Sequence, residues 1–307
     1  MSIINITGTI AKNAEVSGVM GATAITGTLA RNVSIYANIF LRELVTYCPE
    51  AVKLLNAMNI APTKALMDLI DITIMDLKAA GIWAITDKFH RWDLHTGQAS
   101  LLDWKNPAHH AVAGAGTPLF TPKYGVQTKG LEEPLEGNRN WIDLNFNPLA
   151  DCQAGSLNSI GYSLDDLVGT AVTSFNFGAK NTANNSWLMF RTKESDGVNR
   201  PWMYANSILQ RVYNNAGGIK LFYCERNSST TIRLFQTNAL FQQTVSPSVA
   251  MINQRLVLGG YREYNGGVNR YGISSSIFWL GASMSDVQRI AWWNIMNYWK
   301  ANLPQTF

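Results

Sequence analysis

Charge, cysteine and long apolar runs are all scarce in this chain of 307 residues. Charged residues make up 15% of it, against roughly 25% in ordinary soluble domains. Hydrophobic residues make up 47%, which excludes a disordered chain, because disorder needs low hydrophobicity and high charge. A surface poor in charge and rich in Asn, Ser, Thr and Gly suits a protein that works in an assembly or outside a cell.

The three cysteines, Cys48, Cys152 and Cys224, are far apart and lack the CxxC or Cys/His spacing of a metal site. An odd and sparse set favours buried free thiols over a disulfide framework, and therefore folding in a reducing cytoplasm. The first residues, MSIINITGT, lack the basic region and apolar run of a signal peptide. An exterior-type composition without an export signal is typical of a protein released by lysis, such as a part of a virus particle.

Clustered positive charge and membrane-spanning segments are also missing. The net charge is +4, with Lys and Arg scattered singly, so the sequence gives no footprint for nucleic acid. No apolar run reaches the ~18 residues of a membrane span. We therefore expect neither nucleic-acid binding nor membrane insertion, and no motif calls for a cofactor.

A short repeat occupies the first segment, residues 1–36. ITGTIAKN at 6–13 returns as ITGTLARN at 25–32, and its β-branched residues alternate with the period of a strand. Because an isolated pair of short strands is marginal in water, we expect this arm to pair with another copy of the chain or with an attachment partner. A flexible arm is the alternative. The residues expected to carry attachment or oligomerisation are Ile6, Thr7, Gly8, Ile10, Ile25, Gly27 and Leu29.

The second segment, residues 37–81, has a helical period. Pro49 suits the first position of a helix, and Thr63 suits an N-cap after the break at Ala61–Pro62. Gly81 stands where a helix-ending glycine belongs. We expect a short helical hairpin that acts as an adaptor, with an apolar stripe that favours core packing over a partner groove. The stripe consists of Leu66, Leu69, Ile70, Ile74 and Leu77.

The third segment, residues 82–307, is rich in strand and turn patterns and ends in a helix. Turns recur about every ten residues, which predicts an antiparallel sandwich or jelly roll. We expect the stretch 81–148 to supply its first hairpins. WIDLNFNP at 141–148 alternates strictly. Further predicted strands lie at 186–190, 219–226, 231–237, 256–261 and 273–281.

The predicted C-terminal helix begins at a capping box formed by Ser285 and Gln288. Its tryptophans can anchor it on a sheet, since each buries about 150–250 Å². The residues expected on its buried face are Val287, Ile290, Ala291, Asn294, Ile295, Tyr298 and Trp299, widened by Trp292, Trp293 and Met296.

Several motifs occur in a familiar order. They are LKAAGIW at 77–83, ASLLDWKNP at 99–107, LFTPKYGV at 119–126, WIDLNFNP at 141–148 and ASMSDVQRIAWWNIMNYW at 282–299. In this order the chain resembles bacteriophage virion proteins, of the tail-fibre or head-fibre type, that carry a concanavalin A-like (laminin-G-like) lectin domain. The resemblance implies a mainly β fold, an antiparallel concanavalin A-like jelly roll whose concave sheet face and end loops bind glycans. The calcium and manganese ligands of the legume-lectin type have no counterpart here.

Aromatic residues and asparagines near the predicted turns are the candidates for glycan contact, because aromatic faces stack on sugar rings and amides bind hydroxyls. Packing in the sandwich core is the alternative for each aromatic. The candidates are Trp202, Tyr204, Tyr213, Asn214, Tyr261, Tyr264 and Asn265, with Trp187 and Asn215 beside them.

The sequence gives little support for a catalytic site or a metal site. The adjacent carboxylates Glu132–Glu133 and Asp165–Asp166 cannot by themselves face one another across the ~5–10 Å of a glycosidase site. The histidines His90, His95, His109 and His110 lack common zinc-ligand spacing, so we expect surface-loop histidines, no metal site and no enzyme.

The sequence thus predicts a structural phage protein in the virion, made in the host cytoplasm and attached to capsid or tail proteins through its arm. A homotrimer that displays a lectin-like domain to a cell-surface glycan is the expected form. The alternatives are a polysaccharide-degrading tail component, a purely architectural decoration or tail protein without a ligand, and a secreted bacterial lectin, which the absent signal peptide disfavours.

Overall fold

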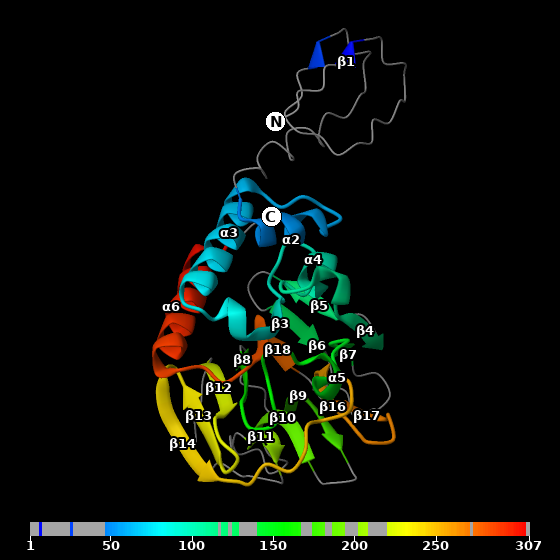
Figure 1. Ribbon diagram of the computed structural model, residues 1–307. Coiled ribbons are helices and arrows are strands. Elements are labelled where there is room, and N and C mark those ends of the chain that lie inside the picture. Colours follow the sequence, from blue (N-terminus) through cyan, green and yellow to red (C-terminus); the bar gives the residue numbers. More distant parts are fainter. Residues whose placement is uncertain are drawn as a thin grey trace.

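The computed structural model describes residues 6–7, 25–26, 47–115, 118–121, 125–128, 140–166, 174–181, 186–193, 202–207, 220–270 and 273–304. In this part of the chain, most strands belong to two large sheets that pack face to face, and helices cover one of them (Figure 1). The predicted antiparallel sandwich with a C-terminal helix is therefore confirmed.

The first large sheet has six strands, and every neighbouring pair in it is antiparallel. Its order is β14 (Ala239–Val245), β13 (Thr231–Gln236), β12 (Lys220–Arg226), β8 (Ile160–Asp166), β19 (Ile277–Gly281) and β3 (Thr86–Arg91).

The second large sheet has eight strands and is antiparallel except where β16 meets β9. Its order is β11 (Trp202–Ser207), β10 (Ser186–Lys193), β9 (Ser174–Asn181), β15 (Val257–Leu258), β7 (Trp141–Asp143) and β4 (Val112–Ala115). In addition, β16 (Gly260–Arg262) pairs with β9, and β17 (Val268–Arg270) pairs with β16. A smaller sheet of β18 (Ile273–Ser275), β6 (Gly125–Thr128) and β5 (Leu119–Thr121) lies beside these two.

The space between the two large sheets is filled by residues of alternate strand positions, since successive side chains of a strand point to opposite faces. Ile142, Leu144 and Phe146 are buried there, as the alternation of WIDLNFNP predicts. Phe177 from the eight-stranded sheet meets Tyr162 and Phe278 from the six-stranded sheet, edge to face.

The helical hairpin forms as predicted. Helix α2 (Pro49–Asn56) has Pro49 at its start, and α3 (Lys64–Ala79) begins at Thr63, whose hydroxyl accepts a hydrogen bond from Leu66 N. Gly81 follows α3 with φ +69°, in the left-handed region that glycine adopts without strain. The predicted apolar stripe of α3 is buried.

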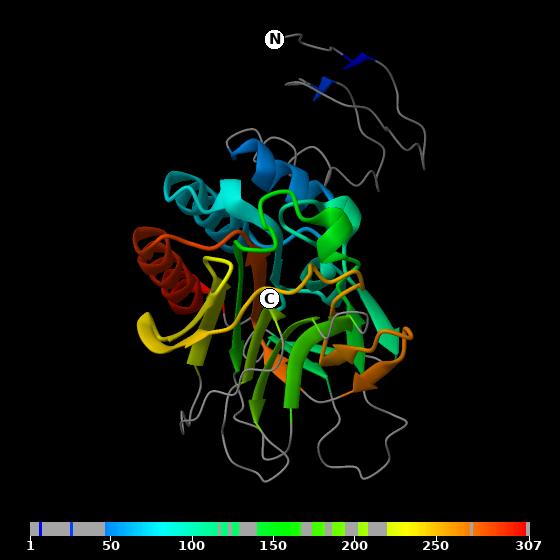
Figure 2. The same ribbon diagram turned by 60° about the horizontal axis from the view of Figure 1, so that its bottom comes forward.

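Helices α3 and α6 (Asp286–Asn302) pack side by side over the outer face of the six-stranded sheet, and α2 packs against α3 (Figure 2). Their apolar residues share one core with Phe89 of β3, Tyr223 of β12 and Trp279 of β19. The described residues 47–81 of the predicted hairpin segment therefore pack directly on described residues of the predicted sandwich segment. The other helices in the described residues are short: η1 (Trp83–Ile85), α4 (Gly97–Leu101), η2 (Pro107–His109) and α5 (Pro148–Asp151). None of the helices described is long and apolar enough to cross a membrane.

Helix α6 starts at the predicted capping box. The predicted buried face is confirmed for Ile295, Trp299 and the widening positions Trp292 and Met296, but it is wrong for the positions at its edge. Val287, Ile290 and Tyr298 are exposed by 78%, 45% and 46%. The buried stripe lies at Trp292, Ile295, Met296 and Trp299, spaced i, i+3, i+4, i+7. The two large indoles fit against the sheet, and burying them removes more apolar surface from water than burying valine or isoleucine at the other positions.

The repeats of the arm form strands at β1 (Ile6–Thr7) and β2 (Ile25–Thr26). These strands pair with each other in parallel, Ile6 opposite Ile25, whereas we expected their partners in another molecule. The other predicted arm residues, Gly8, Ile10, Gly27 and Leu29, lie outside the described residues.

The stretch 81–148 forms one antiparallel pair of consecutive strands, β5 with β6, but not the expected set of first hairpins of the sandwich. Its strands belong to three different sheets: β3 to the six-stranded sheet, β4 and β7 to the eight-stranded sheet, and β5 with β6 to the small sheet. The later predicted strands are confirmed, but the strands β8, β9, β11, β14 and β17 were not predicted.

Candidate functional site

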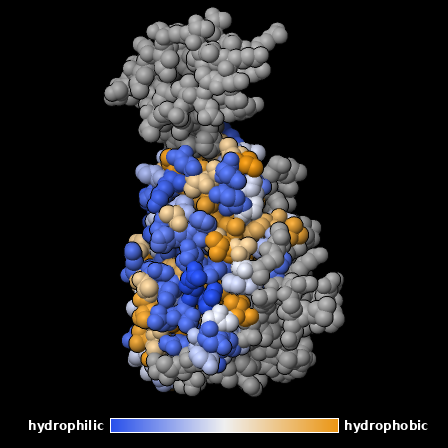
Figure 3. Space-filling model, turned by 90° about the vertical axis from the view of Figure 1, so that its right-hand side faces the viewer, coloured by the Kyte–Doolittle hydropathy of each residue, from blue (hydrophilic) through white to orange (hydrophobic). Residues whose placement is uncertain are grey.

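The outer face of the eight-stranded sheet, the face turned away from the core, carries two groups of aromatic and charged residues. Leu188 and Ile142 are buried between the sheets, so their neighbours Trp187 and Trp141 lie on the opposite side. On the side of the molecule that carries β4 and β17, hydrophilic residues dominate the described surface and apolar residues occur in separate patches (Figure 3).

The first group, called here the Trp187 group, consists of Lys180, Trp187, Tyr261 and Glu263. The rings of Trp187 and Tyr261 are 5.8 Å apart at a tilt of 51°. The ammonium of Lys180 lies 4.6 Å from the centroid of the Trp187 ring and 3.7 Å from a carboxylate oxygen of Glu263. All four are half-buried, and the two rings pack against the fully buried Met189. Both rings are therefore fixed yet accessible from solvent.

The second group surrounds Trp141. Arg262 lies 5.4 Å from the centroid of the Trp141 ring and donates to Asp143 at 2.7 Å, while Arg255 reaches the same carboxylate at 3.5 Å. Burial lowers the pKa of Arg262, and Asp143 opposes that shift. Any Cβ at Gly114 of β4 would fall on the indole, so this glycine lets the ring lie against the sheet.

A tight turn follows the Trp187 group and joins β16 to β17. Tyr264 is 52% exposed there, and the side chain of Asn265 accepts a hydrogen bond from Gly267 N at 3.0 Å. Gly266 has φ +84°, which closes the turn without strain. The turn places an exposed phenol and a fixed amide at the edge of the aromatic surface.

The predicted glycan-contact residues converge in part. Tyr261 belongs to the Trp187 group, and Tyr264 with Asn265 forms the adjacent turn. Trp202 and Tyr204 are on strand β11 rather than on a loop; their backbone positions pair with Arg191 and Met189 of β10, next to the same group. Tyr213 and Asn214, like Asn215, lie outside the described residues. Sequence reasoning missed Lys180 and Glu263, which carry no local pattern and meet only through the β9–β16 pairing.

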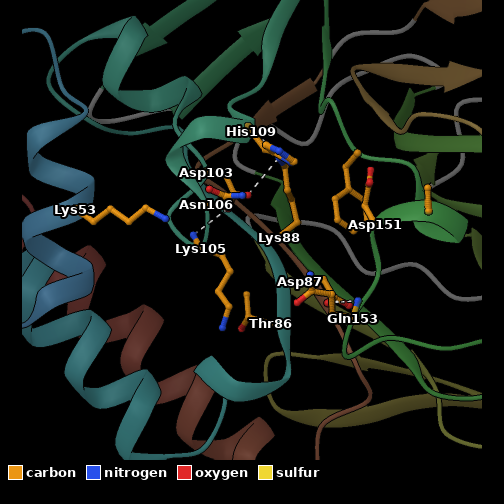
Figure 4. Close-up of a pocket in the computed structure, with 12 residues that line it drawn as sticks. Lys53, Thr86, Asp87, Lys88, Asp103, Lys105, Asn106, His109, Asp151 and Gln153 are labelled. Atoms are coloured by element: carbon orange, nitrogen blue, oxygen red, sulfur yellow. Dashed lines mark hydrogen bonds and ion pairs between the residues drawn. The ribbon is translucent and has the colours of Figure 1, made fainter.

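A cavity of about 390 Å³ lies elsewhere, between α2, the start of β3, the segment 103–109 and α5 (Figure 4). Its walls are mostly polar and carry charges of both signs. They are formed by Lys53, Thr86, Asp87, Lys88, Asp103, Lys105, Asn106, His109, Phe146, Ala150, Asp151 and Gln153.

The buried charges of the cavity wall are paired. The ammonium of Lys88 lies 3.3 Å from Asp103 and donates to the carbonyl of His109. Asp103 also accepts from the backbone N–H groups of Phe89 and Lys105 at 3.2 and 3.0 Å. Burial lowers the pKa of Lys88 and raises the pKa of Asp103, against their mutual attraction. The pair therefore stiffens the wall.

The carboxylate of Asp87, another residue of the cavity wall, is held by backbone N–H groups rather than by a lysine. It accepts hydrogen bonds from the backbone N–H groups of Gln153, Ala154 and Gly155 at 2.8, 2.8 and 2.7 Å. These contacts tie the chain after α5 to strand β3 and close one side of the cavity.

Of the four carboxylates considered for catalysis, Asp165 has a structural role. Asp165 is fully buried and accepts from Ser275, Ser276 and Lys300, so it has no access to a substrate. Glu132–Glu133 lies outside the described residues.

The histidines differ in exposure. His95 is half-buried, with its Nε2 atom 2.8 Å from the carbonyl oxygen of Ile60. His109 and His110 are exposed, as expected of surface histidines. The same expectation is wrong for His90, which is fully buried in β3 and stacks on Trp92 at 4.5 Å; burial lowers its pKa. Cys48, Cys152 and Cys224 are free thiols, of which Cys224 is buried. Among the described residues, no three His, Cys, Asp or Glu side chains are grouped to hold a metal ion.

No protein-family model and no curated protein matches the sequence. Similar solved structures include the binding domain of botulinum neurotoxin serotype D, at 12% identity and a TM-score of 0.47, covering 71% of this chain and 52% of that one. A structure concerned with cell entry of botulinum neurotoxin type C and its interaction with two ganglioside molecules has 11% identity, a TM-score of 0.48, and coverage of 70% and 52%.

A third similar structure is domain 4 of AbnA, an extracellular arabinanase from Geobacillus stearothermophilus, in complex with arabinotriose. It has 14% identity and a TM-score of 0.43, covering 67% of this chain and 98% of that domain. The chain spans about half the length of the toxin chains it matches. These are likenesses of fold alone, and the roles of the sites rest on their own residues.

Proposed function

We propose that the chain is a non-enzymatic structural protein of a bacteriophage particle. Its sandwich adheres to a glycan on the host surface, and its N-terminal arm attaches it to capsid or tail proteins. The order of the sequence motifs supports the phage setting, and the outer face of the eight-stranded sheet supports adhesion. A protein of this kind is made in the host cytoplasm, where free thiols persist, and acts on the virion.

The Trp187 group carries the proposal. Two half-exposed aromatic rings offer apolar faces to the C–H groups of a sugar ring. The ammonium of Lys180 and the carboxylate of Glu263, 3.7 Å apart, offer donors and acceptors to its hydroxyls. Because Met189 packs under the rings, the surface is preformed and little side-chain entropy is lost on binding.

The surface suits an extended glycan. The turn with Tyr264 and Asn265 continues directly from Glu263, and the Trp141 group lies on the same outer face. Both add polar and aromatic positions along the sheet. A chain of several sugar units crossing the strands meets more than one aromatic position, and several weak contacts then add to a useful affinity.

The arm is the proposed attachment device. A two-stranded sheet of β1 and β2 is marginal by itself, and in the described part of the chain these strands pair with no others. We propose that their outer edges add strands from a virion partner or from two further copies in a homotrimer.

Binding is tested with the full-length protein on a glycan array and on purified host polysaccharide. Trp187→Ala is expected to weaken binding at least about tenfold, about 1.4 kcal/mol, and Tyr298→Ala, on the opposite side of the molecule, to leave it unchanged. Bound polysaccharide should keep its length, as expected without hydrolysis. Equal binding by Trp187→Ala and the unaltered protein would refute this site.

Attachment is tested in phage. Deletion of residues 1–36 should abolish incorporation into particles and leave a folded, soluble sandwich. Incorporation of the shortened chain at the normal level would refute the role of the arm.

A further inference from the structure

We infer that the cavity between α2, β3 and α5 is a second binding site, separate from the outer face, for a single small polyhydroxylated molecule of the monosaccharide class. The cavity shares no residue with the Trp187 or Trp141 group. The inference therefore goes beyond the proposed function and stands whether or not the outer face binds a glycan.

The size of the cavity fits one small ligand. Its volume of about 390 Å³ lies in the range of about 300–1,000 Å³ typical of small-molecule sites. Its walls come from the helical hairpin, strand β3, the segment 103–109 and helix α5 (Figure 4). Sites of this kind occur preferentially where two structural units meet, as the hairpin and the sandwich do here.

The wall is rigid because its buried polar groups are already satisfied. The Lys88–Asp103 pair and the three N–H groups on Asp87 fix β3 against its neighbours. Lys105 donates to the carbonyl of Trp83 at 2.6 Å and lies 5.0 Å from the centroid of its ring. A site held in this way is preorganised, so a ligand does not have to order it.

Other polar groups of the wall are unused. Within the described part of the chain, the side chains of Lys53, Asn106, His109 and Gln153 make no hydrogen bond or ion pair. They come from α2, the segment 103–109 and the chain after α5. Together they offer an ammonium, two amides and an imidazole, which are donors and acceptors at several angles.

The mixed chemistry of the wall favours a neutral, hydroxyl-rich ligand over an ion. Three lysines face three aspartates around the cavity, so neither a free anion nor a cation meets a wall of one sign. Hydroxyl groups both donate and accept, and they can use both kinds of partner. Phe146 adds one aromatic side chain to the wall, suited to the apolar face of a pyranose ring.

The test uses the full-length protein, labelled for NMR and titrated separately with glucose, galactose and N-acetylglucosamine. We expect at least one of these to bind in the millimolar range and to shift signals of the cavity wall. Ala150→Phe places a ring in the cavity from an exposed position, and should weaken that binding at least about tenfold. Leu149→Phe, at an exposed neighbour on α5 that does not line the cavity, is the matched control and should bind normally.

Lys53→Ala provides a second variant, because Lys53 is exposed and its loss leaves the core intact. It should weaken binding about threefold to tenfold. Trp187→Ala should leave monosaccharide binding at the cavity unchanged, which separates this inference from the outer face. Absence of shifts for all three sugars, or binding that survives both Ala150→Phe and Lys53→Ala, would overturn the inference.

Discussion

The six-stranded sheet is packed on both faces, and the two faces are covered in different ways. The face toward the eight-stranded sheet is largely apolar: Tyr162, Leu164, Phe222 and Phe278 meet Phe177 and its neighbours there. Charged side chains on that face lie at its margins. Lys88 borders the cavity, and Arg226 donates to the backbone carbonyls of Ala205 and Ser246.

The face toward the helices combines apolar packing with buried polar links. Trp292 of α6 donates to Ser163 at 3.1 Å, and Trp299 donates to Asp93 at 3.1 Å. Arg91 pairs with Asp93 and lies 4.8 Å from the centroid of the Trp299 ring. Apolar burial alone would hold α6 in several registers, whereas directional bonds select one. The face between the sheets therefore stabilises the fold mainly by apolar burial. The face toward the helices also fixes the position of α6.

The largest loss of unfolding free energy is expected for a substitution in the core between the two large sheets. Phe177 is fully buried, with ring centroids 4.7 Å from Tyr162 and 5.2 Å from Phe278. Phe177→Ala removes apolar contacts and leaves a cavity, which should lower the free energy of unfolding by about 3–5 kcal/mol. Tryptophan fluorescence recorded during denaturant unfolding measures this loss. Tyr298→Ala, at an exposed site, should change it by less than about 0.5 kcal/mol. A loss of under about 1 kcal/mol for Phe177→Ala would contradict a tightly packed inter-sheet core.

A smaller, pH-dependent loss of unfolding free energy is expected when Asp165, on the helix-facing side of the sheet, is replaced. Asp165 accepts from Ser276 N at 2.7 Å and from Lys300 of α6 at 3.0 Å. Burial by itself would raise the pKa of Asp165, but Lys300, Ser276 and Arg91 together hold it below the usual 3.8. A carboxyl group with a lowered folded-state pKa stabilises the protein above its ordinary pKa, and this stabilisation is lost as the pH falls through the folded value.

Asp165→Asn should therefore lower the free energy of unfolding by about 1.5–3 kcal/mol at neutral pH. Unfolding curves measured at about pH 7 and about pH 3 should show the gap between variant and unaltered protein narrowing at the lower pH. Asp286→Asn, which changes an exposed carboxylate in the first turn of α6, is the control and should cost about 0.3–1 kcal/mol. A gap that is the same at both values would show that the charge of Asp165 contributes nothing.

The sequence predicts those parts of the fold that local chemistry decides. Thr63, Gly81 and Ser285 mark helix ends because capping involves only nearby residues. The alternation of Ile142, Leu144 and Phe146 predicts an inter-sheet strand because one of its faces is apolar. The strand β8 also alternates, with Ser163 and Asp165 on one side, but both are buried beneath α6. Polar residues that a later helix covers cannot be told from a solvent-exposed strand face.

The candidate sites are less visible in the sequence for a related reason. Tyr261, Tyr264 and Asn265 stand in one turn region and can be found as aromatic and amide residues near a break. Lys180 joins them only through strand pairing. The cavity needs Lys53, Asn106 and Gln153 from three separate segments. No periodicity connects such residues, because tertiary packing alone brings them together.

The smallest effect is expected at the start of α6. The hydroxyl of Ser285 accepts from Gln288 N at 3.2 Å, and the side chain of Gln288 accepts from Ser285 N at 3.0 Å. Ser285→Ala should cost about 1 kcal/mol of unfolding free energy, and Ser285→Asp should restore most of it.

Combining Ser285→Ala with Asp165→Asn tests whether the polar links on the helix-facing side hold α6 along its whole length. Ser285 and Lys300 lie near opposite ends of a helix that rises about 1.5 Å per residue, so the two changes act at well-separated points. If the buried links hold α6 along its whole length, the two losses should add within about 0.3–0.5 kcal/mol in thermal or denaturant unfolding. A double variant that loses clearly less than the sum would mean that α6 detaches once either end is weakened. In that case the polar links would place the helix only while its first turn is capped.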